Sequence, residues 1–251
     1  MHDRHRTAYS IAPSLASSTA AVAAILAAAL CCGPASAHPV AGKTGNAKQA
    51  AFDIVTADIK VDAEKNQLEF RMQVSGKAGA VKPTKTGKFA GSSVFSYVWP
   101  TRIDPSEVGF DKGAGILALA VTAHPDFDDT PLFDTKGNDW HSHWVVLVPD
   151  DVCGKGALKV KDIPAGAKPK LPKTWPGVPL LIDSPGWAPR FASSTVTVRV
   201  PFDDVSAMKG IAFDGVTAGL RVNASAHEPL LCVADVFDVA SGDLSLPGKA
   251  D

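Results

Sequence analysis

The sequence predicts an all-β protein, an antiparallel β-sandwich or barrel with one long proline-rich loop. Short segments rich in Val, Ile, Phe and Trp recur along the chain, and several alternate apolar and polar residues with the period of a strand. Gly, Pro, Asn and Asp separate these segments, and no long stretch follows the helical period. Segments of this kind bury one face against a second sheet or close into a barrel.

The predicted strands begin with a hairpin. Residues 52–61 and 68–75 alternate apolar and polar side chains, and the polar sequence DAEKNQ between them is typical of a turn. One short helical turn is predicted at residues 203–209. The other predicted strands are 94–99, 116–122, 144–148, 157–163, 195–200, 219–223 and 230–239.

The proline-rich loop covers residues 164–190, which contain seven prolines. Proline removes a backbone donor and fixes φ, so this stretch forms neither a helix nor a central strand. We expect an ordered loop laid across the body, anchored by Trp175 and Trp187. An interdomain linker is the alternative, but only about 60 residues follow the loop, and they include Cys232.

The N-terminal residues 1–37 have the pattern of a secretory signal peptide. A basic start precedes the apolar run from Ala20 to Leu30, and Ala35-Ser36-Ala37 fits the small-x-small cleavage rule. We therefore expect a periplasmic or secreted protein whose mature chain starts at His38. Residues 38–50 are small and polar and predict a flexible lead-in, and residues 51–251 predict a single β domain.

The charge balance argues against nucleic acid or an anionic membrane surface as partner. The chain has 25 basic and 26 acidic residues, and removal of Arg4, Arg6 and Asp3 with the leader leaves 23 and 25. No later segment is long and apolar enough to predict a transmembrane helix.

Two cysteines remain after the leader, Cys153 and Cys232. In an oxidising compartment a lone pair of cysteines usually forms a disulfide. A reduced, metal-binding pair is the alternative, although neither cysteine lies in a C-x-x-C motif.

A His-x-His motif in the sequence NDWHSHWVVLVPD, residues 138–150, is the main candidate for chemistry. On a strand His141 and His143 point to the same face, about 6.5–7 Å apart along the chain, and Trp140 and Trp144 point to the other. Two imidazoles on one face can bind one ion at about 2 Å from each nitrogen. The tryptophans would pack in the core and hold the strand in place.

Two further histidines are candidates for a third or fourth ligand. His124 and His227 both lie at predicted strand ends, each close to a proline. A disulfide to Cys232 would bring the region around His227 towards the residues that follow the His-x-His strand. We therefore expect His124 or His227 to join His141 and His143.

Imidazole ligands without a thiolate suit copper, zinc, iron or nickel, and we expect copper, with zinc as the alternative. Residues 126–139 offer a second candidate site, for calcium, because carboxylate and amide oxygens are its usual ligands. A solvated acidic loop is the other interpretation of this stretch. The oxygen donors are Asp126, Asp128, Asp129, Asp134, Asn138 and Asp139.

The histidine pair beside tryptophans resembles the secreted copper-binding proteins of methanotrophs, the MopE/CorA type. The stretch from Trp140 to Trp144, together with His227, carries the resemblance. In that family two histidines hold copper near an oxidised tryptophan, so the resemblance implies copper as the ion. The family's Trp-x-His spacing is not reproduced, since Trp140 directly precedes His141.

The sequence thus predicts a protein that binds or hands over a transition metal. One alternative is a metal-dependent enzyme with an open position on the metal and Asp126 or Glu228 as base. The motifs H-E-x-x-H and G-x-S-x-G of established hydrolases are absent. The other alternative is a module without metal whose aromatic residues and proline-rich loop bind a carbohydrate or a protein.

Overall fold

The computed structural model describes residues 38–128, 139–223 and 230–251. These residues form antiparallel sheets linked by loops and two short 3₁₀ helices, which confirms the predicted all-β class. The predicted leader, residues 1–37, lies outside the described residues. In the described part of the chain, no helix has the length and apolar character needed to cross a membrane.

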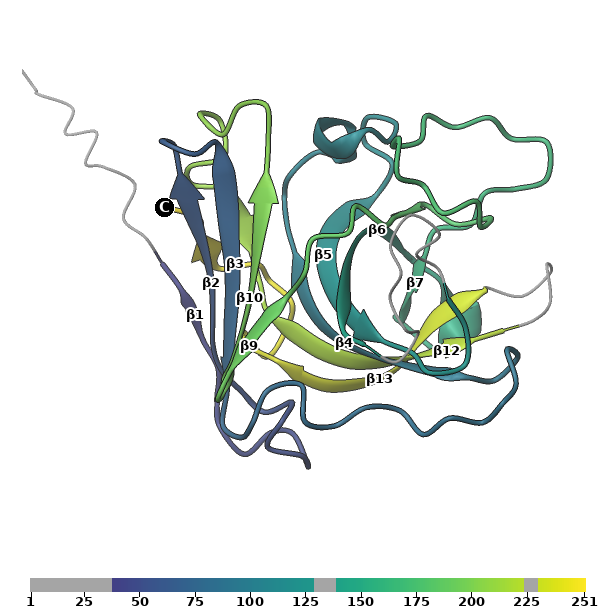
Figure 1. The fold of residues 1–251 in the computed structure, drawn as a ribbon, viewed down its shortest axis with the longest axis horizontal. Coiled ribbons are helices and arrows are strands. Elements are labelled where there is room, and N and C mark those ends of the chain that lie inside the picture. Colours follow the sequence, from purple (N-terminus) through teal and green to yellow (C-terminus); the bar gives the residue numbers. More distant parts are fainter. Residues whose placement is uncertain (1–37, 129–138, 224–229) are drawn as a thin grey trace, which may run out of the picture. The chain divides into compact units, whose positions relative to one another are not determined.

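Six strands close into a barrel (Figure 1). Their order around the wall is β5, β4, β12, β13, β7 and β6, and pairing between β5 and β6 completes the circle. The two-residue strand β8 (Ile182–Asp183) lies along β6 beyond the stretch that pairs with β7. The barrel strands are β4 (Ser93–Pro100), β5 (Ile116–Ala123), β6 (His141–Pro149), β7 (Leu158–Val160), β12 (Val216–Val222) and β13 (Leu231–Val239).

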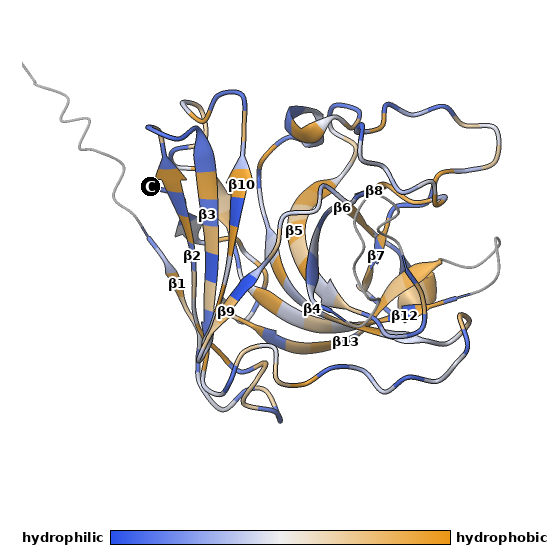
Figure 2. Cartoon of the chain, viewed as in Figure 1, coloured by the Kyte–Doolittle hydropathy of each residue, from blue (hydrophilic) through white to orange (hydrophobic). Residues whose placement is uncertain are grey.

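A five-stranded antiparallel sheet lies beside the barrel (Figure 1). Its order is β1-β2-β3-β10-β9, and strands β11 and β14 form a separate pair. Figure 2 shows the alternation of polar and apolar residues along β3 and β10 that made these strands predictable. The bounds are β1 (Val40–Ala41), β2 (Ile54–Asp62), β3 (Gln67–Val74), β9 (Arg190–Ala192), β10 (Thr195–Pro201), β11 (Ala212–Phe213), β14 (Gly248–Lys249), η1 (Pro105–Val108) and η2 (Asp151–Cys153).

The main hydrophobic core lies between this sheet and the outer face of β4, β5 and β6. Phe70 on β3 meets Trp99 and Trp144 edge-on, with ring centroids 5.9 and 5.7 Å away. All three rings are fully buried, and each such side chain contributes about 2–3 kcal/mol of transfer free energy. The tryptophan at position 144 therefore fixes β6 from outside the barrel.

A second cluster of buried apolar residues lines the inside of the barrel. Because side chains alternate along a strand, the residues of β12 that face inward are Val216, Ala218, Leu220 and Val222. On β6 the same alternation directs His141 and His143 away from Trp144 and its aromatic neighbours. The predicted division of the motif between two faces is thus present in the structure.

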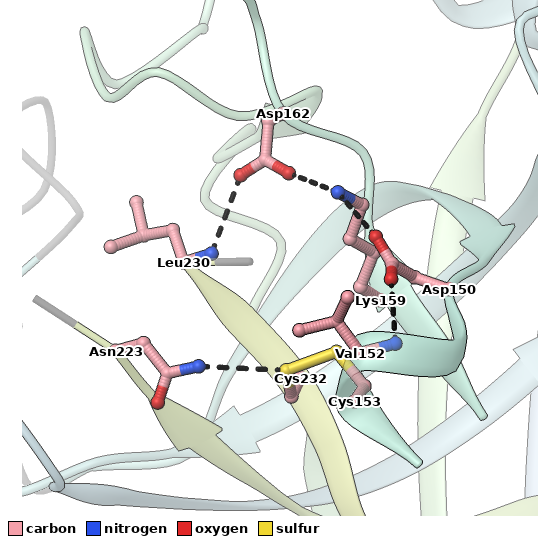
Figure 3. The surroundings of a disulfide bond; sticks show 8 residues. All are labelled: Asp150, Val152, Cys153, Lys159, Asp162, Asn223, Leu230 and Cys232. Carbon is pink, nitrogen blue, oxygen red and sulfur yellow. Dashed lines mark hydrogen bonds and ion pairs between the residues drawn. A yellow bond between two sulfur atoms is a disulfide. The ribbon is translucent and has the colours of Figure 1, made fainter. Parts of the chain in front are cut away.

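The disulfide between Cys153 and Cys232 confirms the predicted pairing, with Cα atoms 5.4 Å apart (Figure 3). It joins the segment after β6 to β13. In the seam between β7 and β13, a single residue pair, Lys159 with Cys232, is in register. Lys159 Nζ also lies 2.8 Å from Asp150 and 2.6 Å from Asp162, so the covalent bond and two ion pairs reinforce this narrow seam.

Two local predictions differ from the structure. Part of the predicted lead-in pairs as β1 with β2, because Val40 buries its side chain in the main core and is only 4% exposed. The predicted helical turn at 203–209 is a non-helical turn. There the Asp204 carboxylate accepts hydrogen bonds from the backbone N–H and the hydroxyl of Ser206, at 2.7 and 2.8 Å, and such local bonds compete with a helix.

Candidate metal centre

The pairing of β5 with β6 assembles a cluster of three histidines, His124, His141 and His143. The register places Thr122 opposite His141 and Ala120 opposite His143, and His124 follows the last residue of β5. One ligand nitrogen from each ring lies within 4.8 Å of the other two. The residues are 2%, 4% and 1% exposed. Among the described residues this is the one group of three or more His, Cys, Asp or Glu side chains arranged to hold a metal ion.

The closest contact within the cluster joins the Nε2 atoms of His124 and His141, which lie 2.8 Å apart. Their rings are nearly perpendicular, with centroids 4.6 Å apart. The ring of His143 lies 4.7 Å from that of His141 by centroid and is also turned edge to face. The three rings therefore converge on one small volume.

The opposite nitrogen of each ring is engaged outside the cluster. Nδ1 of His124 lies 2.9 Å from the Phe127 carbonyl oxygen, and Nδ1 of His141 lies 2.8 Å from that of Asp139. A carbonyl oxygen only accepts hydrogen bonds, so we assign the ring proton to Nδ1 in both residues. This assignment leaves the Nε2 lone pairs of His124 and His141 facing each other.

Two lone pairs at this separation repel each other unless a cation lies between them. A proton shared by the two rings or a metal ion bound by both can fill this role. Metal-bound histidines usually donate their other ring N–H to a carbonyl, a carboxylate or water, as His124 and His141 do here. The hydrogen bonds from both Nδ1 atoms to backbone carbonyls thus fit a preformed metal site as well as two rings that share a proton.

The proline-rich loop supplies the outer partner of His143. Nδ1 of His143 faces the backbone oxygen of Asp183 at 3.3 Å and Ser184 Oγ at 3.0 Å. Asp183 lies in β8, which pairs with β6 at Trp144 and Val145. The loop is therefore ordered against the body where it supports the cluster. Of its two predicted anchors, Trp187 packs against Trp144 with centroids 6.4 Å apart.

The Asp183 side chain is buried beside this contact. Burial raises the pKa of its carboxyl group, against the lowering effect of a hydrogen bond from Thr174. Thr174 Oγ1 donates to Asp183 Oδ1 at 2.6 Å. Thr174, Asp183 and Ser184 were not predicted as site residues, because nothing in their spacing to His143 marks them.

The tryptophan next to the motif lies on the far side of β6. Trp140 packs against Tyr97, with ring centroids 5.1 Å apart, and its Nε1 donates to the Gly79 carbonyl oxygen at 3.0 Å. Its ring belongs to the rim of the main core rather than to the barrel interior. The predicted structural role of this tryptophan fits these contacts.

Of the other predicted ligands, His227 lies outside the described residues, as do Glu228, Asp129, Asp134 and Asn138. Asp126 ties two loops together: its carboxylate accepts hydrogen bonds from the backbone of Thr86 and Gly87 and from the Thr86 hydroxyl. Burial opposes ionisation of Asp126, but these hydrogen bonds outweigh it and lower its pKa, which makes it a weak base.

Two other predicted calcium ligands are described. Asp139 lies 3.7 Å from Lys82 Nζ, and Asp128 is exposed at the mouth of the barrel. The described acidic residues of this stretch do not form a ligand group of three. The calcium site stays a prediction, because half of its proposed ligands lie outside the described residues.

No protein-family model, curated protein or solved structure that was compared matches this chain. The resemblance to the methanotroph copper proteins therefore stays a prediction. The class of the protein follows from its own coordinates: an all-β barrel with a second sheet, a disulfide and a buried three-histidine cluster that can hold a metal ion.

Proposed function

We propose that this protein is secreted or periplasmic and binds a transition-metal ion, copper in preference to zinc, through His124, His141 and His143. One observation carries the proposal. The Nε2 atoms of His124 and His141 face each other at 2.8 Å while both Nδ1 atoms are held by backbone carbonyls. A metal ion between them would turn a repulsive contact into two coordinate bonds.

The donor set is compatible with copper, because imidazole nitrogens without a thiolate suit copper as well as zinc. Copper(II) also binds nitrogen sites more tightly than zinc does, in the usual order of divalent metals.

Secretion is supported by the disulfide and by the leader-like residues 1–37. Disulfides such as Cys153–Cys232 persist in oxidising compartments. A site with imidazoles and no thiolate suits oxidised copper, because thiolate and thioether ligands are those that select Cu(I). The proposed role is therefore to bind or hand over copper in the periplasm or outside the cell.

The test compares the chain with its His141→Ala/His143→Ala variant. Metal content after purification and titration with Cu²⁺ and Zn²⁺ should give one tightly bound ion in the parent and none in the variant. His38→Ala is a second variant, because His38 is exposed, lies outside the cluster and could itself bind Cu²⁺ as the first residue of the mature chain. Copper that this variant retains is therefore not bound by the His38 ring. Equal stoichiometry and affinity in parent and double variant would refute the site and favour a proton as the bridging cation.

A metal-dependent enzyme is the second candidate. It is favoured by the position of His124 and His143, which line the cavity inside the barrel, so a bound metal would be reachable by a molecule there. Dioxygen uptake by the copper-loaded protein with ascorbate as reductant tests an oxidase. Uptake that is the same for the double variant would exclude catalysis at this site.

A further inference from the structure

The barrel interior contains a cavity of about 260 Å³ that opens to the surface. Almost all of the described side chains that line it are aliphatic or aromatic, and they come from every strand of the barrel and from the proline-rich loop. Examples on four different elements are Val98, Val145, Leu180 and Leu220. An apolar cavity of this kind excludes water and favours an apolar occupant.

Small inward-facing residues create the space. Ala120 on β5 and Ala218 on β12 both line the cavity where larger aliphatic residues would fill a barrel of this size. Ser96 on β4 is paired with Ala218 and Thr122 across its two neighbouring strands. The Ser96 hydroxyl donates a hydrogen bond to the Ala218 carbonyl oxygen at 2.9 Å, so its hydrogen-bond partner lies within the barrel wall.

Polar groups gather at one part of the wall. Thr122 on β5, His143 on β6 and His124 directly after β5 all line the cavity, and the exposed Asp128 follows along the chain. Phe127 stacks on His124, with centroids 4.1 Å apart and planes 5° from parallel, and Phe89 meets Phe127 edge-on. The cavity thus has an apolar body and an imidazole end, where the ring of Phe127 covers that of His124.

We propose that the barrel interior binds a neutral, apolar molecule of about ten carbon atoms that carries one nitrogen, oxygen or sulfur donor at the histidine end. The size follows from a cavity of about 150 Å³ that holds benzene, scaled to this volume. Binding of the apolar body depends only on the barrel. The role of the donor atom as a further metal ligand rests on the proposed metal site.

The test uses naphthalene as the apolar body and 1-naphthol as the same body with an oxygen donor, both titrated calorimetrically into the full chain. Zn²⁺ serves as the metal, because it does not oxidise the naphthol. The parent chain without metal should bind naphthalene saturably. Loading with Zn²⁺ should increase the affinity for 1-naphthol at least tenfold. The affinity for naphthalene should change by less than twofold.

Two variants separate the cavity from the cluster. Ala218→Leu places a larger side chain in the cavity from β12. It should lower the affinity for naphthalene at least tenfold, while Zn²⁺ still binds. His141→Ala removes a proposed metal ligand that does not line the cavity, so it should weaken Zn²⁺ binding and keep naphthalene binding. Because Ala218→Leu can misfold, a size series gives a second measurement: the parent should bind benzene and naphthalene but reject pyrene, which is too large for the cavity.

Absence of saturable naphthalene binding to the parent would overturn the proposal. Binding of pyrene to the parent as tightly as naphthalene would also overturn it, and so would unchanged naphthalene affinity in a folded Ala218→Leu variant. If Zn²⁺ binds but does not increase the affinity for 1-naphthol, the proposal that the ligand carries a donor atom at the histidine end is wrong. If Zn²⁺ does not bind while naphthalene does, the metal function fails and the apolar site stands.

Discussion

The backbone oxygen of Asp183 faces Nδ1 of His143 at 3.3 Å, so the proline-rich loop and the histidine strand meet at the site. The same residue holds a buried carboxylate that accepts a hydrogen bond from Thr174. The histidine ring is therefore oriented by a segment 40 residues further along the chain. Such outer contacts commonly change metal affinity by about tenfold to a hundredfold when removed.

Thr174→Val should lower both metal affinity and stability. Removal of the hydroxyl leaves the Asp183 carboxylate without its strong donor, at a cost of about 1.5–3 kcal/mol when the group is ionised. Loss of the donor raises the Asp183 pKa further. Stability from a group with a raised folded pKa is present below the unfolded pKa and is lost as pH rises through the folded value.

Thr174→Val should accordingly lower the free energy of unfolding more at pH 7 than at pH 4. Urea unfolding at both pH values measures it, with Thr197→Val on β10 of the other sheet as control. A penalty that is independent of pH would show that the threonine acts by packing alone.

Acidification should release the metal. Imidazole coordinates metals only in its neutral form, so protons compete with the ion for each ring. We expect at least a hundredfold loss of Cu²⁺ affinity between pH 7.5 and pH 5.5, measured by competition with a chelator of known proton dependence. Affinity that stays constant over this range would argue for carboxylate or backbone ligands in place of the histidines.

Removal of the disulfide with Cys153→Ala/Cys232→Ala should lower the free energy of unfolding by about 4.5 kcal/mol in the chain-entropy model. The bond spans 79 residues and closes the seam between β7 and β13. Hydrogen exchange should accelerate first in these two strands. Uniform acceleration over the whole barrel would instead indicate that the seam opens only with global unfolding.

Tyr97 should remain protonated well beyond the usual range. Burial, opposed by a hydrogen bond from the Gly79 N–H, raises its pKa to about 12, and its hydroxyl donates to the Ala51 carbonyl oxygen at 2.8 Å. Since the folded pKa lies above the unfolded value, the associated stability is complete below pH 10 and is lost between about pH 10 and pH 12.

The Tyr97→Phe variant tests this assignment. It should cost about 1–3 kcal/mol at neutral pH, because the buried Ala51 carbonyl and the partly buried Gly79 N–H lose a partner. It should also remove part of the alkaline decline in stability and the tyrosinate absorbance that develops near pH 12 in the parent. Identical alkaline unfolding curves for parent and variant would contradict the assignment.

Much of the fold was predictable because strand alternation is a local property. The hairpin of β2 and β3 and the cores of β4, β5, β10 and β13 follow directly from the order of apolar residues. Strands β8 and β9 were missed because the prolines around them mask any pattern. Strand β1 was missed because its burial depends on one residue, Val40, packing against distant strands.

The sequence by itself determined that His141 and His143 share one face of a strand and that Trp144 occupies the other, since a strand has period two. The lone pair of cysteines likewise determined the disulfide. Only the tertiary structure decided that His124 joins the cluster, that Asp183 and Ser184 support it, and that small residues on β5 and β12 leave a cavity beside it. These relations depend on strand register and barrel closure, which arise from contacts between residues far apart in the chain and leave no local pattern.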